Sequence, residues 1–215
     1  MKKLSNTDLE NTNKRYSKRF KEFGHDQKSV GWGEKGRQVE RFKILLDSLN
    51  LEKSKPYNVL DIGAGFGDLY SFLNESNICV ENYLGYELVK DLFDEGIRYY
   101  GHNQNFKLLN EDFLESNQFI CNNYDVAFMS GCFNFKLLDG DNYDYIENCL
   151  TKAYQLSKIG ICANFLTNRV DYEEDYIFYS DPQKIIDIAY SLSRRFTIDH
   201  SYFPFEFTVA IFKDQ

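Results

Sequence analysis

Long hydrophobic runs are missing from this sequence, and the apolar stretches that it has are short and interrupted by polar residues. Nothing in it resembles the roughly 20 apolar residues of a membrane-spanning helix. The first residues, Met1-Lys2-Lys3-Leu4-Ser5-Asn6, lead into a polar segment and not into the apolar core of a signal peptide. We therefore expect a cytoplasmic protein that has no membrane partner.

Cysteine and histidine are few and scattered. The three histidines, His25, His102 and His200, lie far apart and form no His-x-x-x-His motif, so we expect no metal site. The cysteines are odd in number and form no Cys-x-x-Cys pair, which predicts reduced and mostly buried thiols. They are Cys79, Cys121, Cys132, Cys149 and Cys162.

Lys and Arg are fewer than Asp and Glu, and they are unevenly distributed along the sequence. The formal net charge of −8 argues against a nucleic-acid partner. Residues 1–55 nevertheless carry 14 Lys and Arg against 8 Asp and Glu, a net of +6, which leaves −14 for residues 56–215. Two interpretations stay open: the basic side chains coat amphipathic helices, or they attract an anionic substrate.

Aromatic and other hydrophobic residues are plentiful. They make up 17% and 43% of the 215 residues, enough for one domain with a core and for aromatic side chains in a ligand pocket. Helical spacing of apolar residues predicts helices over Asp8–Phe23 and Gly36–Leu49, with a loop over His25–Gly33 between them. We assign residues 1–55 to an N-terminal helical arm or lid and residues 56–215 to the main domain.

After Pro56, short apolar runs alternate with helical patterns, which predicts a mainly parallel sheet with helices on both faces. Strands are expected over Asn58–Ile62, Tyr83–Glu87, Phe106–Leu109, Asp125–Ser130, Gly160–Leu166, Phe196–His200 and Phe205–Phe212. Helices are expected over Asp68–Asn74, Val89–Tyr100, Tyr143–Ser157 and from Asp181-Pro182 to Arg195. The last two strands, joined around Pro204, predict a terminal antiparallel hairpin in an α/β sheet of seven strands.

The first strand runs into the segment Val59-Leu60-Asp61-Ile62-Gly63-Ala64-Gly65-Phe66-Gly67-Asp68. Glycines between a strand and a helix let a ligand come close to backbone N–H groups. Dinucleotide-binding folds typically show Gly-x-Gly-x-x-Gly, whereas the spacing here is Gly63-x-Gly65-x-Gly67 with Asp61 in front.

This pattern resembles the motif of class I S-adenosylmethionine (SAM)-dependent methyltransferases. The resemblance implies their Rossmann-like fold, SAM as cofactor and S-adenosylhomocysteine as product, with an N-terminal helical cover over the ligands. It implies that the turn of Gly63, Ala64, Gly65 and Gly67 passes beneath the methionine and ribose of SAM. Asp61 would organise the turn or reach the amino group.

Later strand ends extend the resemblance. Glu87, followed by Leu88, stands 20 residues after Gly67, where a carboxylate can accept hydrogen bonds from both ribose hydroxyls, a feature that NAD enzymes share. In the family, an acid and an apolar neighbour after the third strand hold the adenine, and Asp112 and Phe113 fit these positions. The end of the fourth strand lines the cofactor, which implies a role for Ser130 and Gly131.

Candidates for catalysis and substrate binding rest on weaker signals. His200, near the end of the sixth strand, is a candidate general base, and Asn134 a candidate for orienting the substrate, although an exposed histidine and a turn asparagine are the alternatives. Four arm residues are candidates for the cover, and the arginine among them could pair with a carboxylate or phosphate. These are Tyr16, Trp32, Gln38 and Arg41, and Tyr172 and Tyr176 in the long connection after the fifth strand are candidates for a lid.

The substrate class is narrowed by a missing motif. Methylation of adenine or glutamine amino groups in this superfamily typically uses Asn/Asp-Pro-Pro-aromatic after the fourth strand, and Ser130-Gly131-Cys132-Phe133 lacks both prolines. We expect methyl transfer to a small polar metabolite, at oxygen, with a phosphorylated or sugar-derived compound as a candidate acceptor. The alternatives are a nicotinamide-dependent oxidoreductase and a non-catalytic SAM-fold protein. The sequence indicates no oligomeric state.

Overall fold

Seven strands form one sheet in the computed structural model, which describes residues 3–33, 37–117 and 124–214. They are β1 (Pro56–Ile62), β2 (Cys79–Tyr86), β3 (Phe106–Leu109), β4 (Tyr124–Met129), β5 (Ser157–Leu166), β6 (Phe196–Asp199) and β7 (Glu206–Phe212). Their order is β3-β2-β1-β4-β5-β7-β6. The first five are parallel, and β7 runs antiparallel to both β5 and β6. The predicted α/β fold with its terminal hairpin is confirmed.

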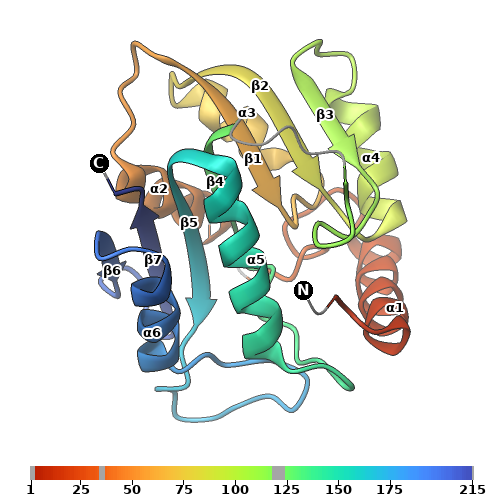
Figure 1. The fold of residues 1–215 in the computed structure, drawn as a ribbon. Coiled ribbons are helices and arrows are strands. Elements are labelled where there is room, and N and C mark those ends of the chain that lie inside the picture. Colours follow the sequence, from red (N-terminus) through yellow and green to blue (C-terminus); the bar gives the residue numbers. More distant parts are fainter. Residues whose placement is uncertain (1–2, 34–36, 118–123, 215) are drawn as a thin grey trace.

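Six helices surround the sheet in the described part of the chain: α1 (Asn6–Phe23), α2 (Arg37–Leu49), α3 (Asp68–Glu75), α4 (Lys90–Tyr100), α5 (Asn142–Leu156) and α6 (Pro182–Leu192). Helices α5 and α6 cover one face of the sheet, and α2, α3 and α4 cover the other (Figure 1). Helix α1 lies beside α4, on the side where the parallel strands end. No helix among the described residues is long and apolar enough to cross a bilayer. The predicted start of the second helix, Gly36, and the thiol of Cys121 lie outside the described residues.

The strand pattern explains why helices are needed on both faces. Successive strand residues point to opposite faces, so Val59 and Phe128 pack in the cluster under α2 and α3, while Leu60 and Met129 pack in the cluster under α5 and α6. All four are fully buried. Consecutive apolar residues such as Val59-Leu60 and Phe128-Met129 are typical of parallel strands that are covered by helices on both faces.

Helix boundaries follow their capping residues. Ser5 accepts a hydrogen bond from Asp8 N–H at 3.0 Å and begins α1. Asp181 caps α6 in the same way, with Pro182 in the first turn as predicted. This helix ends at Leu192, before the predicted Arg195, because the backbone becomes extended at Ser193, whose N–H makes the last helical hydrogen bond to Ala189 O.

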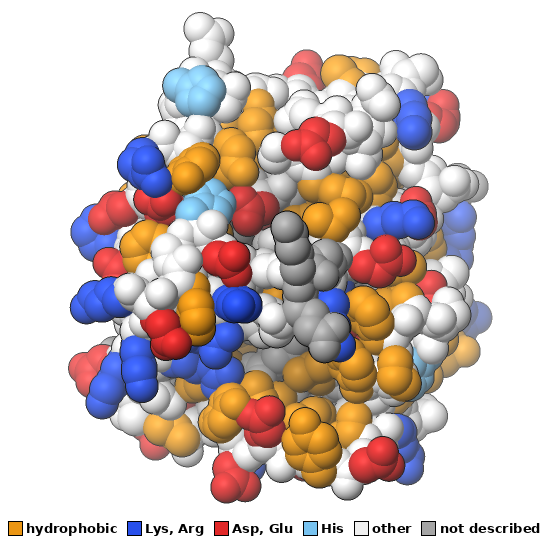
Figure 2. Space-filling model, turned by 180° about the vertical axis from the view of Figure 1, so that it is seen from behind, with side chains coloured by type: hydrophobic (Ala, Val, Ile, Leu, Met, Phe, Trp, Pro, Cys, Tyr) orange, Lys and Arg blue, Asp and Glu red, His pale blue; other side chains and the backbone are white. Residues whose placement is uncertain are grey.

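Helix α2 belongs to the core of the sheet and not to a separate arm. Phe42, Leu45 and Leu49 are buried in the cluster that holds β1 and β4. The cover over the strand ends is therefore formed by α1 and the loop of residues 24–33, which we call the arm. Lys and Arg side chains gather on the α1 side of the molecule, at the left of Figure 2.

Candidate functional site

A cavity of about 120 Å³ lies where β1, β2 and β4 end, beneath the arm. We call it the turn pocket. It is the place where open α/β sheets bind their ligands, at the carboxyl ends of strands on either side of a switch in strand order. The predicted cofactor residues that line it are Asp61, Gly63, Ala64, Gly65, Glu87, Leu88, Phe113, Ser130 and Gly131.

The glycine turn needs its glycines for two different reasons. Gly63 has a φ of +73°, and a Cβ there would lie 2.5 Å from Cys132 Cβ, so its absence lets the turn pass against the end of β4. Gly67 has a φ of +86° and begins α3, and a Cβ there would lie 2.8 Å from the Phe106 ring. Gly67 does not line the pocket. The structure gives it a packing role in place of the predicted cofactor contact.

Asp61 lies buried at the end of β1, below the turn. The hydroxyl of Tyr83, on the neighbouring strand β2, donates a hydrogen bond to its Oδ2 atom. Burial raises the pKa of Asp61 to about 7, although the Tyr83 hydrogen bond works in the opposite direction. Asp61 thus connects the first two strands directly under the pocket floor.

Glu87 connects the end of β2 to the glycine turn. Its Oε2 atom accepts a hydrogen bond from Gly65 N–H at 2.8 Å, and its Oε1 atom accepts one from Val89 N–H at 2.7 Å. Burial raises the pKa of Glu87 to about 7, and the two backbone hydrogen bonds oppose that rise. A buried carboxylate with backbone donors on both oxygens faces the pocket.

Polar groups at the end of β4 form another wall of the turn pocket. Gly131 donates its N–H to Asn164 Oδ1 on β5 at 2.7 Å. Ser130 Oγ lines the pocket and is buried with no hydrogen-bond partner among the described residues. A buried hydroxyl without a partner is costly, and a polar ligand in the pocket would satisfy it.

The arm closes the pocket from outside. Tyr16 of α1 and Trp32 of the loop, both predicted for the cover, line the cavity, and so does the third predicted residue, Gln38 of α2. Trp32 lies so close to Gly131 that a Cβ on that glycine would overlap the indole ring. Val30 packs with Phe66 beside the glycine turn. The pocket therefore has one wall of strand ends and one wall of arm residues.

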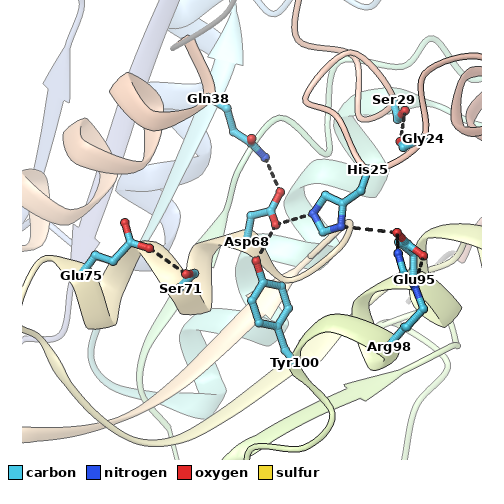
Figure 3. Close-up of polar contacts among 10 residues, drawn as sticks. All are labelled: Gly24, His25, Ser29, Gln38, Asp68, Ser71, Glu75, Glu95, Arg98 and Tyr100. Carbon is cyan, nitrogen blue, oxygen red and sulfur yellow. Dashed lines mark hydrogen bonds and ion pairs between the residues drawn. The ribbon is translucent and has the colours of Figure 1, made fainter.

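A polar cluster around His25 fastens the arm to α3 and α4 (Figure 3). His25 Nε2 lies 3.0 Å from Asp68 Oδ1, at the start of α3, and the ring stacks on Phe66 with centroids 4.1 Å apart. The hydroxyl of Tyr100 donates to the same Asp68 oxygen at 2.9 Å, and Glu95 lies 3.7 Å from His25 Nδ1. We call these five residues the arm latch.

Asp112, predicted to hold the adenine, does not line the pocket. Its Oδ1 atom accepts a hydrogen bond from Leu114 N–H at 2.9 Å, which stabilises the turn after β3. The neighbouring Glu111 and Phe113 line the pocket in its place. The other carboxylate oxygen, Asp112 Oδ2, is buried with no hydrogen-bond partner among the described residues, and the adenine contact stays a prediction.

Three other candidates also lie away from the pocket. Arg41 is buried in an ion pair with Glu206 of β7, with Nε to Oε2 at 2.7 Å, and its guanidinium lies 3.9 Å from the centroid of the Trp32 ring. It therefore positions Trp32, and its buried Nη1 atom has no hydrogen-bond partner among the described residues. Asn134 Oδ1 accepts a hydrogen bond from Leu166 N–H at 3.2 Å, so this side chain links the loop after β4 to the end of β5. His200 is exposed in the turn after β6, with its Nε2 3.4 Å from Pro204 O.

The predicted lid tyrosines are not over the turn pocket. Tyr172 is 74% exposed, and Tyr176 packs on Arg15 of α1 outside the pocket. Conversely, Tyr86, Glu111 and Tyr145 line the pocket without having been predicted. Tyr86 and Glu111 directly precede the predicted residues Glu87 and Asp112, and this position next to a strand end could have indicated them. Tyr145 comes from α5, where no local sequence pattern indicates a pocket residue.

Neither a scan against protein-family models nor a search of curated proteins finds a match. Solved structures do match. Magnesium protoporphyrin IX methyltransferase from Synechocystis PCC 6803 with bound S-adenosylhomocysteine has a TM-score of 0.68 at 10% identity, over 96% of this chain and 100% of that one. The same enzyme with bound SAM gives 0.67 at 12% identity, over 96% and 97%. A SAM-dependent methyltransferase from Mesorhizobium loti gives 0.59 at 13% identity, over 81% and 100%. The chain thus has the fold of class I SAM-dependent methyltransferases.

Proposed function

We propose that this protein is a SAM-dependent methyltransferase that transfers a methyl group to an oxygen atom of a small polar acceptor. One observation carries the proposal: the Glu87 carboxylate at the end of β2 and the glycine turn after β1 meet in one pocket, joined by the 2.8 Å hydrogen bond from Gly65 N–H. Structures with the same fold contain SAM or S-adenosylhomocysteine, which supports this interpretation.

The residues of the turn pocket suit SAM. Each Glu87 oxygen accepts one backbone hydrogen bond and has a second acceptor position for a ribose hydroxyl, and Phe113 and Leu88 offer apolar contacts for a base. Gly63 and Gly65 line the pocket with backbone, which the methionine part of SAM can approach closely. Ser130 Oγ, buried without a partner, is available to a polar ligand atom.

Bound SAM would supply a methyl group activated on a sulfonium centre. The task of this chain is then to align the acceptor oxygen with that methyl group and to exclude water, which alone accounts for a large part of the acceleration of such displacements. No histidine is among the described residues that line the pocket. An acceptor oxygen that is already ionised, as in a carboxylate or phosphate, needs no base.

A nicotinamide-dependent oxidoreductase is the alternative from another enzyme class. The turn spacing Gly63-x-Gly65-x-Gly67 differs from the dinucleotide pattern, in which a third glycine allows close packing of helix and strand. A cytoplasmic location is also part of the proposal. It is supported by Cys79, Cys132, Cys149 and Cys162, which are all free thiols.

Calorimetric titration of the protein with SAM, S-adenosylhomocysteine and NAD tests the proposal. We expect micromolar binding of the first two ligands and none of the third. Methyl transfer is then measured with tritiated SAM on small carboxylates, phosphorylated sugars and hydroxy compounds. A folded protein that binds NAD and neither of the other ligands would overturn the assignment, and SAM binding without turnover on any acceptor would favour the non-catalytic alternative.

A further inference from the structure

A second hollow of about 620 Å³ lies on the outer side of the arm, open to solvent. Four cationic side chains line it, Arg15, Lys18 and Arg19 of α1 and Lys28 of the loop, with Glu22 as the one acid among its described lining residues. We call it the basic hollow. In Figure 2, Lys and Arg side chains gather on this side of a molecule whose net charge is −8.

The spacing of these residues on α1 places them on one face of the helix. Residues 15, 18, 19 and 22 follow the i, i+3, i+4, i+7 pattern that aligns side chains along a helix. If these charges only coated the solvent-exposed face of an amphipathic helix, three cations would not need to line the same concave surface. Part of the net positive charge of residues 1–55 is thus located in the basic hollow.

The cations of the hollow are not neutralised by acidic partners. None of the ion pairs among the described residues involves Arg15, Lys18, Arg19 or Lys28. Glu174 acts on Arg15 only through its more distant charge. An anion that enters the hollow would therefore find cations free to bind it.

Aromatic rings and a backbone contact hold the cations in place. The Arg15 guanidinium lies 4.4 Å from the centroid of the Tyr176 ring and 5.3 Å from that of Phe135. Arg19 Nε donates to Lys28 O at 2.7 Å, which ties the loop to the helix. Guanidinium groups stacked on rings keep their N–H edges available for an oxyanion.

The basic hollow is a direct neighbour of the turn pocket. Phe135 lines both, and Tyr16, which lines the turn pocket, is next in sequence to Arg15. Trp32 of the turn pocket is likewise next to Gly33 of the hollow. The Phe135 side chain thus separates the hollow from the turn pocket by one shared residue.

We propose that the basic hollow binds an anionic group of the methyl acceptor, a phosphate, sulfate or carboxylate carried on an organic ring or chain. This inference rests on the proposed methyltransferase function and adds the substrate class. The anion lies between Arg15, Lys18 and Lys28, and Tyr176 and Phe135 contact the organic part next to it. The other end of the acceptor then points towards the turn pocket.

Phenyl phosphate is a suitable probe because it combines an anion with a ring. We expect it to bind the full chain, with an affinity that falls as salt is added, while neutral benzyl alcohol does not bind. The double variant Arg15→Gln/Lys18→Gln should bind phenyl phosphate about tenfold more weakly, the effect of one strong charge-assisted contact. Lys14→Gln is the matched control: it removes an exposed charge from the same helix outside the hollow.

SAM titrations on the same samples separate this inference from the proposed function. Unchanged SAM binding with weakened phenyl phosphate binding supports it. Equal phenyl phosphate binding by the wild type and the double variant would overturn it, and so would stronger binding to phosphatidylglycerol vesicles than to the free probe, since that would assign the hollow to a lipid surface. Phenyl phosphate binding without SAM binding would reject the cofactor and leave an anion site. Should the double variant fail to fold, Lys28→Gln replaces it, because Lys28 lies in the loop and is exposed.

Discussion

Glu87 carries out two roles with one carboxylate. In this structure its oxygens hold the glycine turn through Gly65 N–H and Val89 N–H, and the same oxygens are the ones that we assign to the ribose of SAM. Because each carboxylate oxygen has two acceptor positions, the ribose hydroxyls can bind while Gly65 N–H and Val89 N–H keep their hydrogen bonds.

Replacement of Glu87 by alanine tests this assignment. Loss of one or two charge-assisted hydrogen bonds should weaken SAM binding by about 10- to 100-fold in a calorimetric titration. Glu81→Ala, on the exposed part of the same strand, is the control and should bind like the wild type. An unchanged affinity in Glu87→Ala would remove this residue from the cofactor site.

The two buried acids also make stability depend on pH. Asp61 and Glu87 both have a folded-state pKa of about 7, raised above their ordinary values by burial. Between about pH 5 and pH 7 the native state therefore binds more protons than the unfolded state, so the free energy of unfolding falls as pH rises, by at most roughly 1.4 kcal/mol per pH unit for each group.

Urea denaturation at pH 5, 6 and 7 measures this slope. The double variant Asp61→Asn/Glu87→Gln cannot titrate at these positions, and its free energy of unfolding should change less over the same range than that of the wild type. Parallel curves for the two proteins would show that the acids titrate alike in the folded and unfolded states.

At the scale of elements, the ion pair between Arg41 and Glu206 joins α2 to β7. Both side chains are buried, so a variant that removes one partner leaves the other charge unpaired in the core. We expect Arg41→Met to lower the free energy of unfolding by about 3–5 kcal/mol. The double variant Arg41→Met/Glu206→Leu should recover most of that loss, because it leaves no buried charge, and the exposed Lys43→Met on the same helix serves as the control.

The contact between Trp32 and Gly131 joins the arm to β4, and Trp32 is the single tryptophan of the chain. In Gly131→Ala the new methyl group takes the space of the indole ring and meets a φ of +68°. We expect Trp32 emission to shift to longer wavelength as the ring moves into water, with a loss of stability of about 1–3 kcal/mol. Gly33→Ala, where a Cβ meets nothing within 4 Å, should keep the wild-type spectrum.

At the scale of the whole molecule, the arm has to move before a cofactor can enter. The turn pocket of about 120 Å³ is smaller than the roughly 300–1,000 Å³ of typical ligand sites. The arm latch around His25 is the polar attachment that has to open. Entry would then be controlled at α1 and the loop, while the sheet stays fixed.

Replacement of His25 by alanine should speed this opening. Loss of the hydrogen bond to Asp68 and of the stacking on Phe66 is worth about 1 kcal/mol, or about a fivefold faster association of SAM. Stopped-flow measurement of Trp32 fluorescence gives the rate. His102→Ala, an exposed histidine outside the latch, is the control, and equal rates in all three proteins would show that the latch does not limit entry.

Local patterns allowed most of the fold and half of the pocket to be predicted. The strand ending at Ile62, the glycine turn and the acid at Glu87 are each encoded in a few consecutive residues, and the structure brings them together. Arg41 could not be assigned in this way, because its partner Glu206 is 165 positions away. The adenine contact of Asp112 stays a prediction: its carboxylate accepts from Leu114 N–H in the turn after β3 and does not line the pocket in this structure.

The ion pair between Arg41 and Glu206 has a consequence for synthesis of the chain. Arg41 leaves the ribosome early, whereas β7, which carries Glu206, is the last strand and inserts between β5 and β6. Until then, burial of α2 against the sheet would enclose a cation with no counter-charge, which is unfavourable by several kcal/mol. Nascent chains that stop short of β7 should therefore stay open and sensitive to proteases, so the pair delays final folding until the sheet can be finished.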